Sequence, residues 1–125
     1  MGVGTYVGEP DDYTDYLMYD GIKTSVLSGG VNHIDTAPNY RYTKSEATVG
    51  RVLSTLDNKY GITRDQMFVT SKGGYIPEDA DRMISIGDQK RRIVKDLGVP
   101  EEDIVKETNH SLNPIFLKDQ LESSL

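Results

Sequence analysis

Apolar residues recur at helical spacing along the stretch Thr14–Leu27. Met18, Ile22 and Val26 lie four residues apart, with polar residues between them, and Gly29-Gly30 follows directly after the stretch. This spacing places the apolar side chains on one face, and the glycine pair is typical of a helix stop. The pattern predicts an amphipathic helix over Thr14–Leu27.

A second amphipathic helix is predicted from Thr43 onward. The segment Thr43-Lys-Ser-Glu46 has the form of a capping box, in which the first and fourth side chains satisfy free backbone N–H groups at a helix start. Asn58–Gly61 marks the expected end. Between these limits four apolar residues continue at helical spacing: Val49, Val52, Leu53 and Leu56.

Three short apolar stretches of strand length alternate with these helices. They are Gly2–Gly8, Val31–Ala37 and Met67–Val69. The order strand, helix, strand, helix, strand indicates right-handed βαβ units around a parallel sheet. The pattern therefore predicts an α/β fold with about three parallel strands and flanking helices.

The region 75–112 is less regular than the first half of the chain. Pro77–Ile86 and Asp88–Leu97 could each form a helix, and Pro100 has the position of a first helical residue before Glu101–Ile104. We interpret 75–112 as a long insertion over the end of the third strand.

Asn113 and Pro114 predict one more helix, with Asn113 as the cap and Pro114 as the first helical residue. Leu117, Leu121 and Leu125 would then share one face. The chain stops on this apolar stripe, without the glycine or basic turn that usually closes a helix. We therefore expect that sequence following Leu125 is missing.

Composition and charge narrow the range of functions. The net charge of −6, with 20 acidic against 14 basic residues, makes nucleic acid and anionic lipid unfavourable partners. The chain has no cysteine and two isolated histidines, which excludes thiolate chemistry and predicts no metal site. It has no apolar stretch of membrane-spanning length and no signal peptide in these residues. We expect small-molecule chemistry in a reduced, cytoplasmic setting, with no membrane partner.

Three residues of complementary chemistry fall at or just after predicted strand ends. Asp35 closes the second strand, Tyr40 lies five residues further on, and Lys72 closes the third strand. Parallel sheets bind ligands at the carboxyl ends of their strands. An ammonium favours the phenolate of a nearby tyrosine, and a carboxylate can hold that ammonium in place. The trio can therefore tune Tyr40 as a general acid without a metal or a thiol.

Each member of the trio also has an ordinary structural alternative. Asp35 could be a turn or capping residue, Tyr40 a half-buried loop aromatic, and Lys72 a solvated charge at a strand end. The basic residues Lys90, Arg91, Arg92 and Lys95 have acidic residues close by in the sequence, a pattern typical of a solvated helix face rather than a phosphate site; the acids are Asp88, Asp96, Glu101 and Glu102.

Four segments resemble the aldo-keto reductase family in order and spacing. They are Gly4-Thr5-Tyr6, the segment Gly30–Tyr40 with its Ile34-Asp35-Thr36-Ala37 core, Ser45-Glu46 followed by Val49-Gly50, and Thr70–Gly74. The resemblance covers residues 1–74 and extends to the helix over 113–125. It implies a (β/α)8 barrel, present here as an incomplete barrel, so that residues 1–125 would be the N-terminal portion of a single NADP-dependent oxidoreductase domain.

The resemblance also assigns roles. Asp35, Tyr40 and Lys72 match three of the four catalytic residues of the family, with Tyr40 as the acid; the fourth is a histidine that would lie beyond Leu125. The implied cofactor is NADP (NADPH), with NAD as the alternative. Its implied contacts are Gly4, Thr5, Tyr6 and Asp35, and the implied substrate contacts are Tyr6, Tyr40 and His110. His110 has the alternative of an ordinary solvated loop histidine.

The function implied is NAD(P)H-dependent reduction of an aldehyde, ketone or sugar carbonyl, or the reverse oxidation. We expect the 125-residue chain to be inactive by itself and to self-associate, because an open parallel sheet leaves edge groups unpaired. Two alternatives stay open: a non-catalytic accessory protein of the same fold, and a small α/β binding module.

Overall fold

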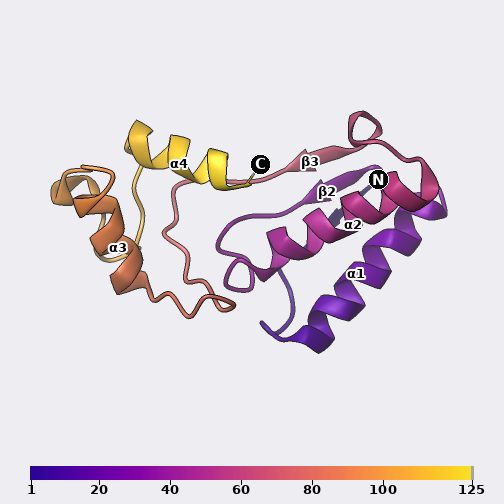
Figure 1. The fold of residues 1–125 in the computed structure, drawn as a ribbon, viewed down its shortest axis with the longest axis horizontal. Coiled ribbons are helices and arrows are strands. Elements are labelled where there is room, and N and C mark those ends of the chain that lie inside the picture. The colour runs from indigo at the N-terminus through magenta and orange to yellow at the C-terminus, as the bar shows by residue number, and fades with distance from the viewer. Residues whose placement is uncertain (125) are drawn as a thin grey trace.

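Three short parallel strands form the sheet of this protein (Figure 1). The computed structural model describes residues 1–124. The strands, which lie side by side in chain order, are β1 (Gly2–Gly4), β2 (His33–Asp35) and β3 (Phe68–Thr70). Gly4 pairs with Asp35, and Asp35 pairs with Thr70, so the carboxyl ends of all three strands meet at one end of the sheet. The predicted parallel sheet is confirmed.

The strands are shorter than the apolar stretches that predicted them. The expected strands over Gly2–Gly8 and Val31–Ala37 each keep only three residues, and the expected Met67–Val69 is displaced by one. Strand length follows from pairing with a neighbour, which the propensity of a single stretch does not determine. After β1, the N–H of Thr5 still donates to the Asp35 carbonyl at 3.0 Å, and the chain then turns away toward the first helix.

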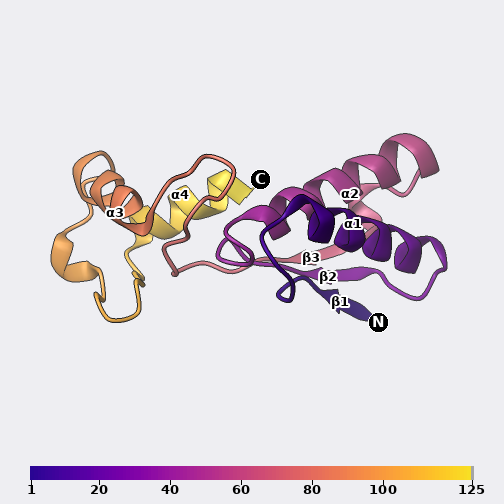
Figure 2. The same ribbon diagram turned by 90° about the horizontal axis from the view of Figure 1, so that it is seen from below.

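Two helices, α1 (Asp12–Leu27) and α2 (Lys44–Tyr60), cover one face of the sheet (Figure 2). Both helices and their apolar faces were predicted correctly. The side chains of Ile34, Val52 and Leu56 are fully buried between the helices and the sheet. We call this set the sheet cluster; its buried members are Ile22, Val26, Ile34, Val49, Val52, Leu56 and Met67.

The opposite face of the sheet is uncovered in the described part of the chain. Side chains alternate along a strand, so His33 and Phe68 point away from the helices that Ile34 contacts. Phe68 is 70% exposed. β1 and β3 are edge strands within residues 1–124, so the sheet is unclosed, as in an incomplete barrel. Every helix in these residues is too short or too polar to span a membrane.

The start of α2 corrects the prediction of a capping box. Thr43 has a left-handed backbone, with φ +73°, and its side chain makes no capping hydrogen bond. A side-chain cap requires an extended backbone at that residue, which the left-handed conformation does not provide. The Glu46 carboxylate instead accepts hydrogen bonds from the hydroxyls of Ser71 and Ser124. Glu46 therefore links α2 to the chain after β3 and to the last helix.

The segment between β3 and the last helix forms a second hydrophobic cluster together with Phe116 of that helix. Among the described residues this segment has one α-helix, α3 (Ile86–Lys95), and a short 3-10 helix at Glu101–Asp103. Another short 3-10 helix, Arg64–Gln66, lies before β3. We call the second set the insertion cluster; its buried members are Ile76, Ile93, Val99, Ile104 and Phe116. The segment and the last helix therefore bury a small core beside the sheet (Figure 1).

Two local predictions in this segment were wrong. Pro77–Ile86 is not a helix, because Asp79 and Ile84 exchange backbone hydrogen bonds of 3.0 Å in an antiparallel bridge. The helix starts later, at a capping box in which Ser85 and Asp88 bond to each other's backbone N–H groups. Pro100 lies one residue before the 3-10 helix rather than within it, with ψ 138°.

The last helix is α4 (Pro114–Ser124). Its predicted cap is confirmed, since the Asn113 side-chain oxygen accepts a hydrogen bond from the Ile115 N–H at 2.9 Å. The predicted apolar face is wrong. Phe116 and Gln120 are buried, whereas Leu121 is 63% exposed; Leu125 lies outside the described residues. The buried face is the one that meets the insertion cluster and the chain after β3.

Candidate functional site

Asp35 and Lys72 form an ion pair at the carboxyl end of the sheet. The Lys72 Nζ lies 2.7 Å from an Asp35 carboxylate oxygen and donates a second hydrogen bond to the Thr36 carbonyl at 3.0 Å. The Lys72 side chain is 44% exposed and the Asp35 side chain is 39% exposed. The pairing follows from the sheet register, because Asp35 lies opposite Thr70, two residues before Lys72.

Tyr40 lies beside this ion pair. The Lys72 ammonium is 4.6 Å from the centroid of the Tyr40 ring, within the range of a cation–π interaction. The ring of Tyr6, in the loop after β1, meets the Tyr40 ring edge to face, with centroids 5.1 Å apart. The structure therefore brings together the three residues predicted as catalytic and one residue predicted to contact the cofactor and substrate.

The charge of Lys72 is stabilised by its neighbours. Burial by itself would lower the pKa of the ammonium. Hydrogen bonding to the Asp35 carboxylate and the proximity of the Tyr40 phenol outweigh that effect, so the pKa of Lys72 is raised above its ordinary value. Lys72 therefore keeps its positive charge beside the Tyr40 ring at neutral pH.

The residues predicted to contact a cofactor divide into two sets. Gly4 and Tyr6 lie on the surface, and a Cβ placed on Gly4 would meet nothing within 4 Å. Thr5 is fully buried, and its hydroxyl donates to the Asp35 carbonyl at 3.1 Å. The Thr5 carbonyl in turn accepts a hydrogen bond of 2.7 Å from the Ser45 hydroxyl. In this structure Thr5 supports Asp35 from beneath and offers no surface to a ligand.

His110 lies in the segment between β3 and α4, apart from the trio. Its ring meets the Tyr75 ring edge to face at 5.0 Å, and its backbone pairs with Val105 and Tyr75. A Cβ on Gly74 would lie 2.4 Å from the His110 Nε2, so this glycine leaves room for the ring. Within residues 1–124 His110 forms no hydrogen bond with Asp35, Tyr40 or Lys72. Its predicted contact with substrate stays a prediction.

A buried cluster of charges follows Tyr40 directly and was missed in the sequence. Asp15 of α1 accepts hydrogen bonds from Arg41 at 2.6 Å and from Lys44 at 3.3 Å. The three side chains are 9%, 1% and 9% exposed, respectively. One sequence signal could have found the cluster: Asp15 lies three residues before Met18 and seven before Ile22, on the apolar face of its helix. A carboxylate at such a position requires a buried partner.

The loop between Tyr40 and α2 has an unusual backbone. Three consecutive residues without a glycine among them, Arg41, Tyr42 and Thr43, have φ values of 51°, 55° and 73°. Left-handed conformations of such residues cost on the order of 1–3 kcal/mol each and persist only where the surroundings impose them. The turn that carries the Tyr40 side chain is therefore held in place by other parts of the fold.

Ion pairing sets the charge state of the buried cluster. Burial by itself would raise the pKa of Asp15, but hydrogen bonds from Arg41 and Lys44 outweigh it and the pKa is lowered. The pKa of Lys44 is raised, mainly by its hydrogen bond to Asp81, against the effect of burial. Both groups are therefore charged in the folded protein at neutral pH.

We expect the melting temperature to fall steeply below about pH 4, because the unfolded chain protonates Asp15 near that pH. The folded pKa of Asp15 is lower than the unfolded one, so its ion pairs stabilise the fold above the unfolded pKa. That stabilisation is lost as the pH falls through the folded pKa. Melting curves between pH 7 and pH 3 measure this dependence.

Asp15→Asn should melt at a lower temperature than wild type at pH 7 and show a shallower fall in acid. The matched control is Asp12→Asn, since the fully exposed Asp12 side chain contacts the same Lys44 at 3.3 Å. This control should keep the acid slope of wild type. If the melting temperatures of wild type and Asp15→Asn fell equally steeply with pH, the loss of stability in acid could not be assigned to Asp15.

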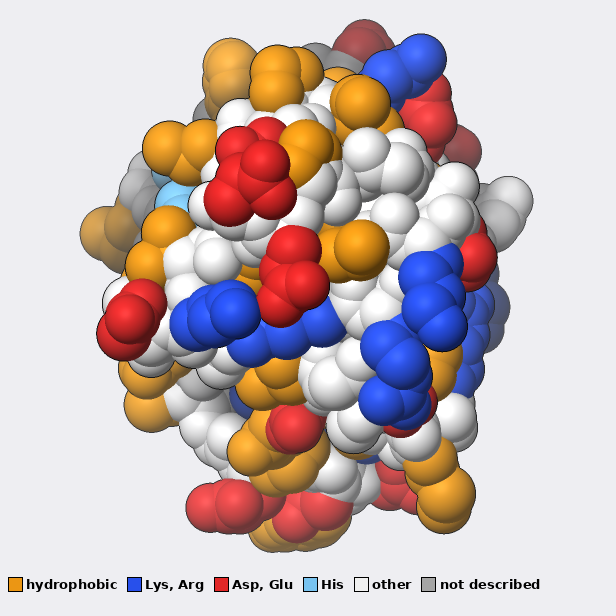
Figure 3. Space-filling view, turned by 90° about the vertical axis from the view of Figure 1, so that its left-hand side faces the viewer, with side chains coloured by type: hydrophobic (Ala, Val, Ile, Leu, Met, Phe, Trp, Pro, Cys, Tyr) orange, Lys and Arg blue, Asp and Glu red, His pale blue; other side chains and the backbone are white. Residues whose placement is uncertain are grey.

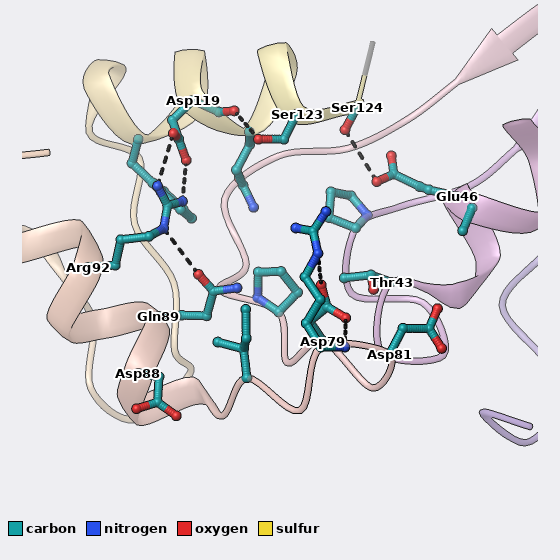
Figure 4. A pocket seen from close by; sticks show the side chains of 17 residues that line it. Thr43, Glu46, Asp79, Asp81, Asp88, Gln89, Arg92, Asp119, Ser123 and Ser124 are labelled. Carbon is teal, nitrogen blue, oxygen red and sulfur yellow. Dashed lines mark hydrogen bonds and ion pairs between the residues drawn. The ribbon is translucent and has the colours of Figure 1, made fainter. Parts of the chain in front are cut away.

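A cavity of about 610 Å³ lies between the start of α2, the segment 77–92 and α4 (Figure 4). Arg92 of α3 forms a two-point ion pair with Asp119 of α4, at 3.2 and 2.5 Å, across one wall. Glu46 lies on the opposite wall (Figure 4). Asp35, Tyr40 and Lys72 do not line the cavity among the described residues, so the cavity is separate from the candidate active site.

Two of the four basic residues of α3 form ion pairs with acids. Arg91 pairs with Asp88 and Arg92 with Asp119, and Lys106 beyond the helix pairs with Glu101. Figure 3, which views this end of the molecule, shows Lys and Arg side chains next to Asp and Glu. The surface is a mixed-charge helix face of the kind that the sequence predicted.

Comparison with known proteins gave one result. The family model described as the aldo/keto reductase family matches residues 1–111. The search of curated proteins and the search of solved structures found no match.

Proposed function

Since the chain belongs to the aldo/keto reductase family, we propose that it serves in NAD(P)H-dependent reduction of an aldehyde, ketone or sugar carbonyl, or in the reverse oxidation. Members of this family are (β/α)8 oxidoreductases that generally use NAD(P)H. One observation carries the proposal: the Asp35–Lys72 ion pair lies against the Tyr40 ring. A cytoplasmic location is part of the proposal, and the absence of cysteine in all 125 residues is compatible with it.

The surface at the carboxyl end of the sheet fits the nicotinamide end of NADPH or NADH. Gly4 leaves open space above the strand end, and Tyr6 is 71% exposed beside it. Gly4, Tyr6 and Asp35 would hold this end of the cofactor, with Thr5 fixing the Asp35 backbone beneath. When bound, such a cofactor supplies or accepts a hydride at the carbonyl carbon.

In the proposed reaction Tyr40 donates the proton of its hydroxyl to the carbonyl oxygen. The phenolate that remains would lie near the Lys72 ammonium, whose positive charge stabilises it. The raised pKa of Lys72 keeps this charge in place. Asp35 holds Lys72 through the 2.7 Å ion pair. In the oxidative direction the phenolate would take the proton back.

We propose that the isolated 125-residue chain does not turn over. Its sheet is unclosed within residues 1–124, and neither His33 nor His110 forms a hydrogen bond with Tyr40 there. The remaining strands and a catalytic histidine would come from sequence outside this chain. Self-association of the isolated chain through the edges of β1 and β3 is part of the same proposal.

The test is an NADPH titration of the purified chain, followed by nicotinamide fluorescence, with a melt of the same samples. Turnover assays with aldehydes, ketones and sugars are run on the chain and on a longer form that closes the barrel. We expect turnover in the longer form alone. Saturable NADPH binding without turnover in that form would favour the accessory role, and absence of both would overturn the proposal.

A further inference from the structure

The guanidinium of Arg41 joins the two loops that carry the active-site aromatic residues. Its Nε and Nη2 donate to the Glu9 carbonyl at 2.9 and 2.8 Å, and Nη2 also contacts the Asp11 carbonyl at 3.3 Å. The same Nη2 lies 2.6 Å from the Asp15 carboxylate. The Arg41 side chain is 1% exposed, so these contacts are shielded from water.

The Arg41 contacts connect the loop after β1 to the loop after Tyr40. Glu9 lies three residues after Tyr6, in the loop that leaves β1, and Arg41 follows Tyr40 directly. Fixing Glu9 to Arg41 therefore fixes the backbone beside Tyr6 relative to the backbone beside Tyr40. The edge-to-face contact of the two rings, with centroids 5.1 Å apart, is formed between these points.

We propose that Arg41 is a positioning residue for Tyr40: by binding Glu9 and Asp15, it holds the left-handed turn after Tyr40 and sets the phenol against Tyr6 and Lys72. We call these contacts the Arg41 clamp. Its purpose in catalysis rests on the proposed function, but the geometry it sets can be measured without catalysis.

An arginine suits this position better than a lysine. Its planar fork presents several donors in fixed directions, so that one carbonyl and one carboxylate can be bound at once. Asp15 neutralises the buried charge. The clamp helps to hold the three consecutive left-handed residues, together with the 3.2 Å hydrogen bond that the Ala80 N–H donates to the Tyr42 carbonyl.

Lys72 does not replace the clamp. It contacts the Tyr40 ring from the β3 side, and its side chain is 44% exposed. Its other contacts are to Asp35 and Thr36, on β2 and just after it. The Ser45 hydroxyl at the start of α2 also bonds the Thr5 carbonyl at 2.7 Å, whereas the Arg41 guanidinium links the turn that directly follows Tyr40 to Glu9 in the loop after β1.

The test uses NMR of the full 125-residue chain with ¹³C-labelled tyrosine. Tyr40 and Tyr6 signals are assigned with Tyr40→Phe and Tyr6→Phe. In wild type we expect nuclear Overhauser effects between the two rings. In Arg41→Gln we expect these effects to be lost and the Tyr40 ring signals to shift toward those of free tyrosine.

Two internal comparisons separate positioning from general damage. Tyr19, whose hydroxyl bonds to Thr55 between α1 and α2, should keep its signals in Arg41→Gln. Arg51→Gln is the matched control, because the 58% exposed Arg51 contacts the same Asp15 at 3.3 Å without touching either loop. It should leave the Tyr40–Tyr6 effects intact.

Retained Tyr40–Tyr6 effects in Arg41→Gln would overturn the proposal, as would their equal loss in Arg51→Gln. If Arg41→Gln also shifts Tyr19, the less disruptive Arg41→Lys decides. That variant keeps the charge beside Asp15 but lacks the fork, so weakened Tyr40–Tyr6 effects with unchanged Tyr19 signals support the clamp. Unchanged Tyr40–Tyr6 effects in Arg41→Lys refute it.

The outcome is independent of the proposed reaction. A clamp that behaves as expected, in a protein whose longer form shows no NADPH-dependent turnover, would leave Arg41 as a positioning residue and remove the oxidoreductase proposal. Turnover in the longer form together with intact ring contacts in Arg41→Gln would keep the oxidoreductase proposal and remove the proposed role of Arg41.

Discussion

Tyr40→Phe is expected to lower carbonyl turnover by about 10²–10⁴-fold in a form of the protein that closes the barrel, which is the usual contribution of a positioned acid. Phenylalanine keeps the ring, and with it the contacts to the Lys72 ammonium and the Tyr6 edge. The change removes only the hydroxyl that is proposed to donate the proton. Steady-state kinetics should show a fall in kcat, with KM and the Kd for NADPH nearly unchanged.

The matched control for this variant is Tyr42→Phe. Tyr42 lies two residues further along the same left-handed turn, and it is 45% exposed. Loss of its hydroxyl should leave kcat within about twofold of wild type, as for a surface substitution away from the chemistry. Tyr40→Phe with normal turnover would remove the mechanism, and equal losses in both variants would point to the loop rather than to the proton donor.

Phe116→Ala should lower the free energy of unfolding of the insertion cluster by about 3–5 kcal/mol, the range for truncation of a buried aromatic residue. Phe116 is 2% exposed and is the largest side chain of that cluster. Because the cluster has few other buried residues, the loss should unfold the segment 76–124 locally while the sheet cluster stays folded. Amide hydrogen exchange measures this difference: protection should fall at Ile93 and persist at Leu56.

Leu121→Ala is the control. It tests whether α4 buries the face seen in the structure or the leucine face predicted from the sequence. Leu121 belongs to the leucine stripe of the sequence but is 63% exposed in the structure. Its truncation should change stability by less than about 0.5 kcal/mol. Losses equal to those of Phe116→Ala would mean that the leucine face is buried. If Phe116→Ala also removed protection at Leu56, the two clusters would form one cooperative unit.

Loss of the insertion cluster has a consequence for the site. Gln120, on the same helix as Phe116, accepts a hydrogen bond from the Gly74 N–H and donates one to the Tyr75 carbonyl, both at 2.7 Å. These two bonds hold the chain directly after Lys72. The insertion cluster is thus connected to the candidate active site through α4.

The sequence by itself determined the elements that depend on local pattern. Periodic apolar residues located α1 and α2, because one face of each helix must be buried against the sheet. The alternation of strands and helices fixed the parallel order of the sheet. That order brought Asp35 and Lys72 to the same end of neighbouring strands, so their pairing followed from position in the chain. The match of the family model to residues 1–111 confirms the family that the same motifs indicated.

Only the tertiary structure decided which groups satisfy one another across the chain. A capping-box pattern at Thr43 gave way to a left-handed turn, because contacts of Arg41 with Glu9 and Asp15 fix that loop. The buried face of α4 is set by Phe116 and Gln120 rather than by its leucines, because their neighbours come from distant segments. Spacing within one helix records which side chains share a face. It does not record which partner that face will meet, and burial and hydrogen bonding depend on that partner.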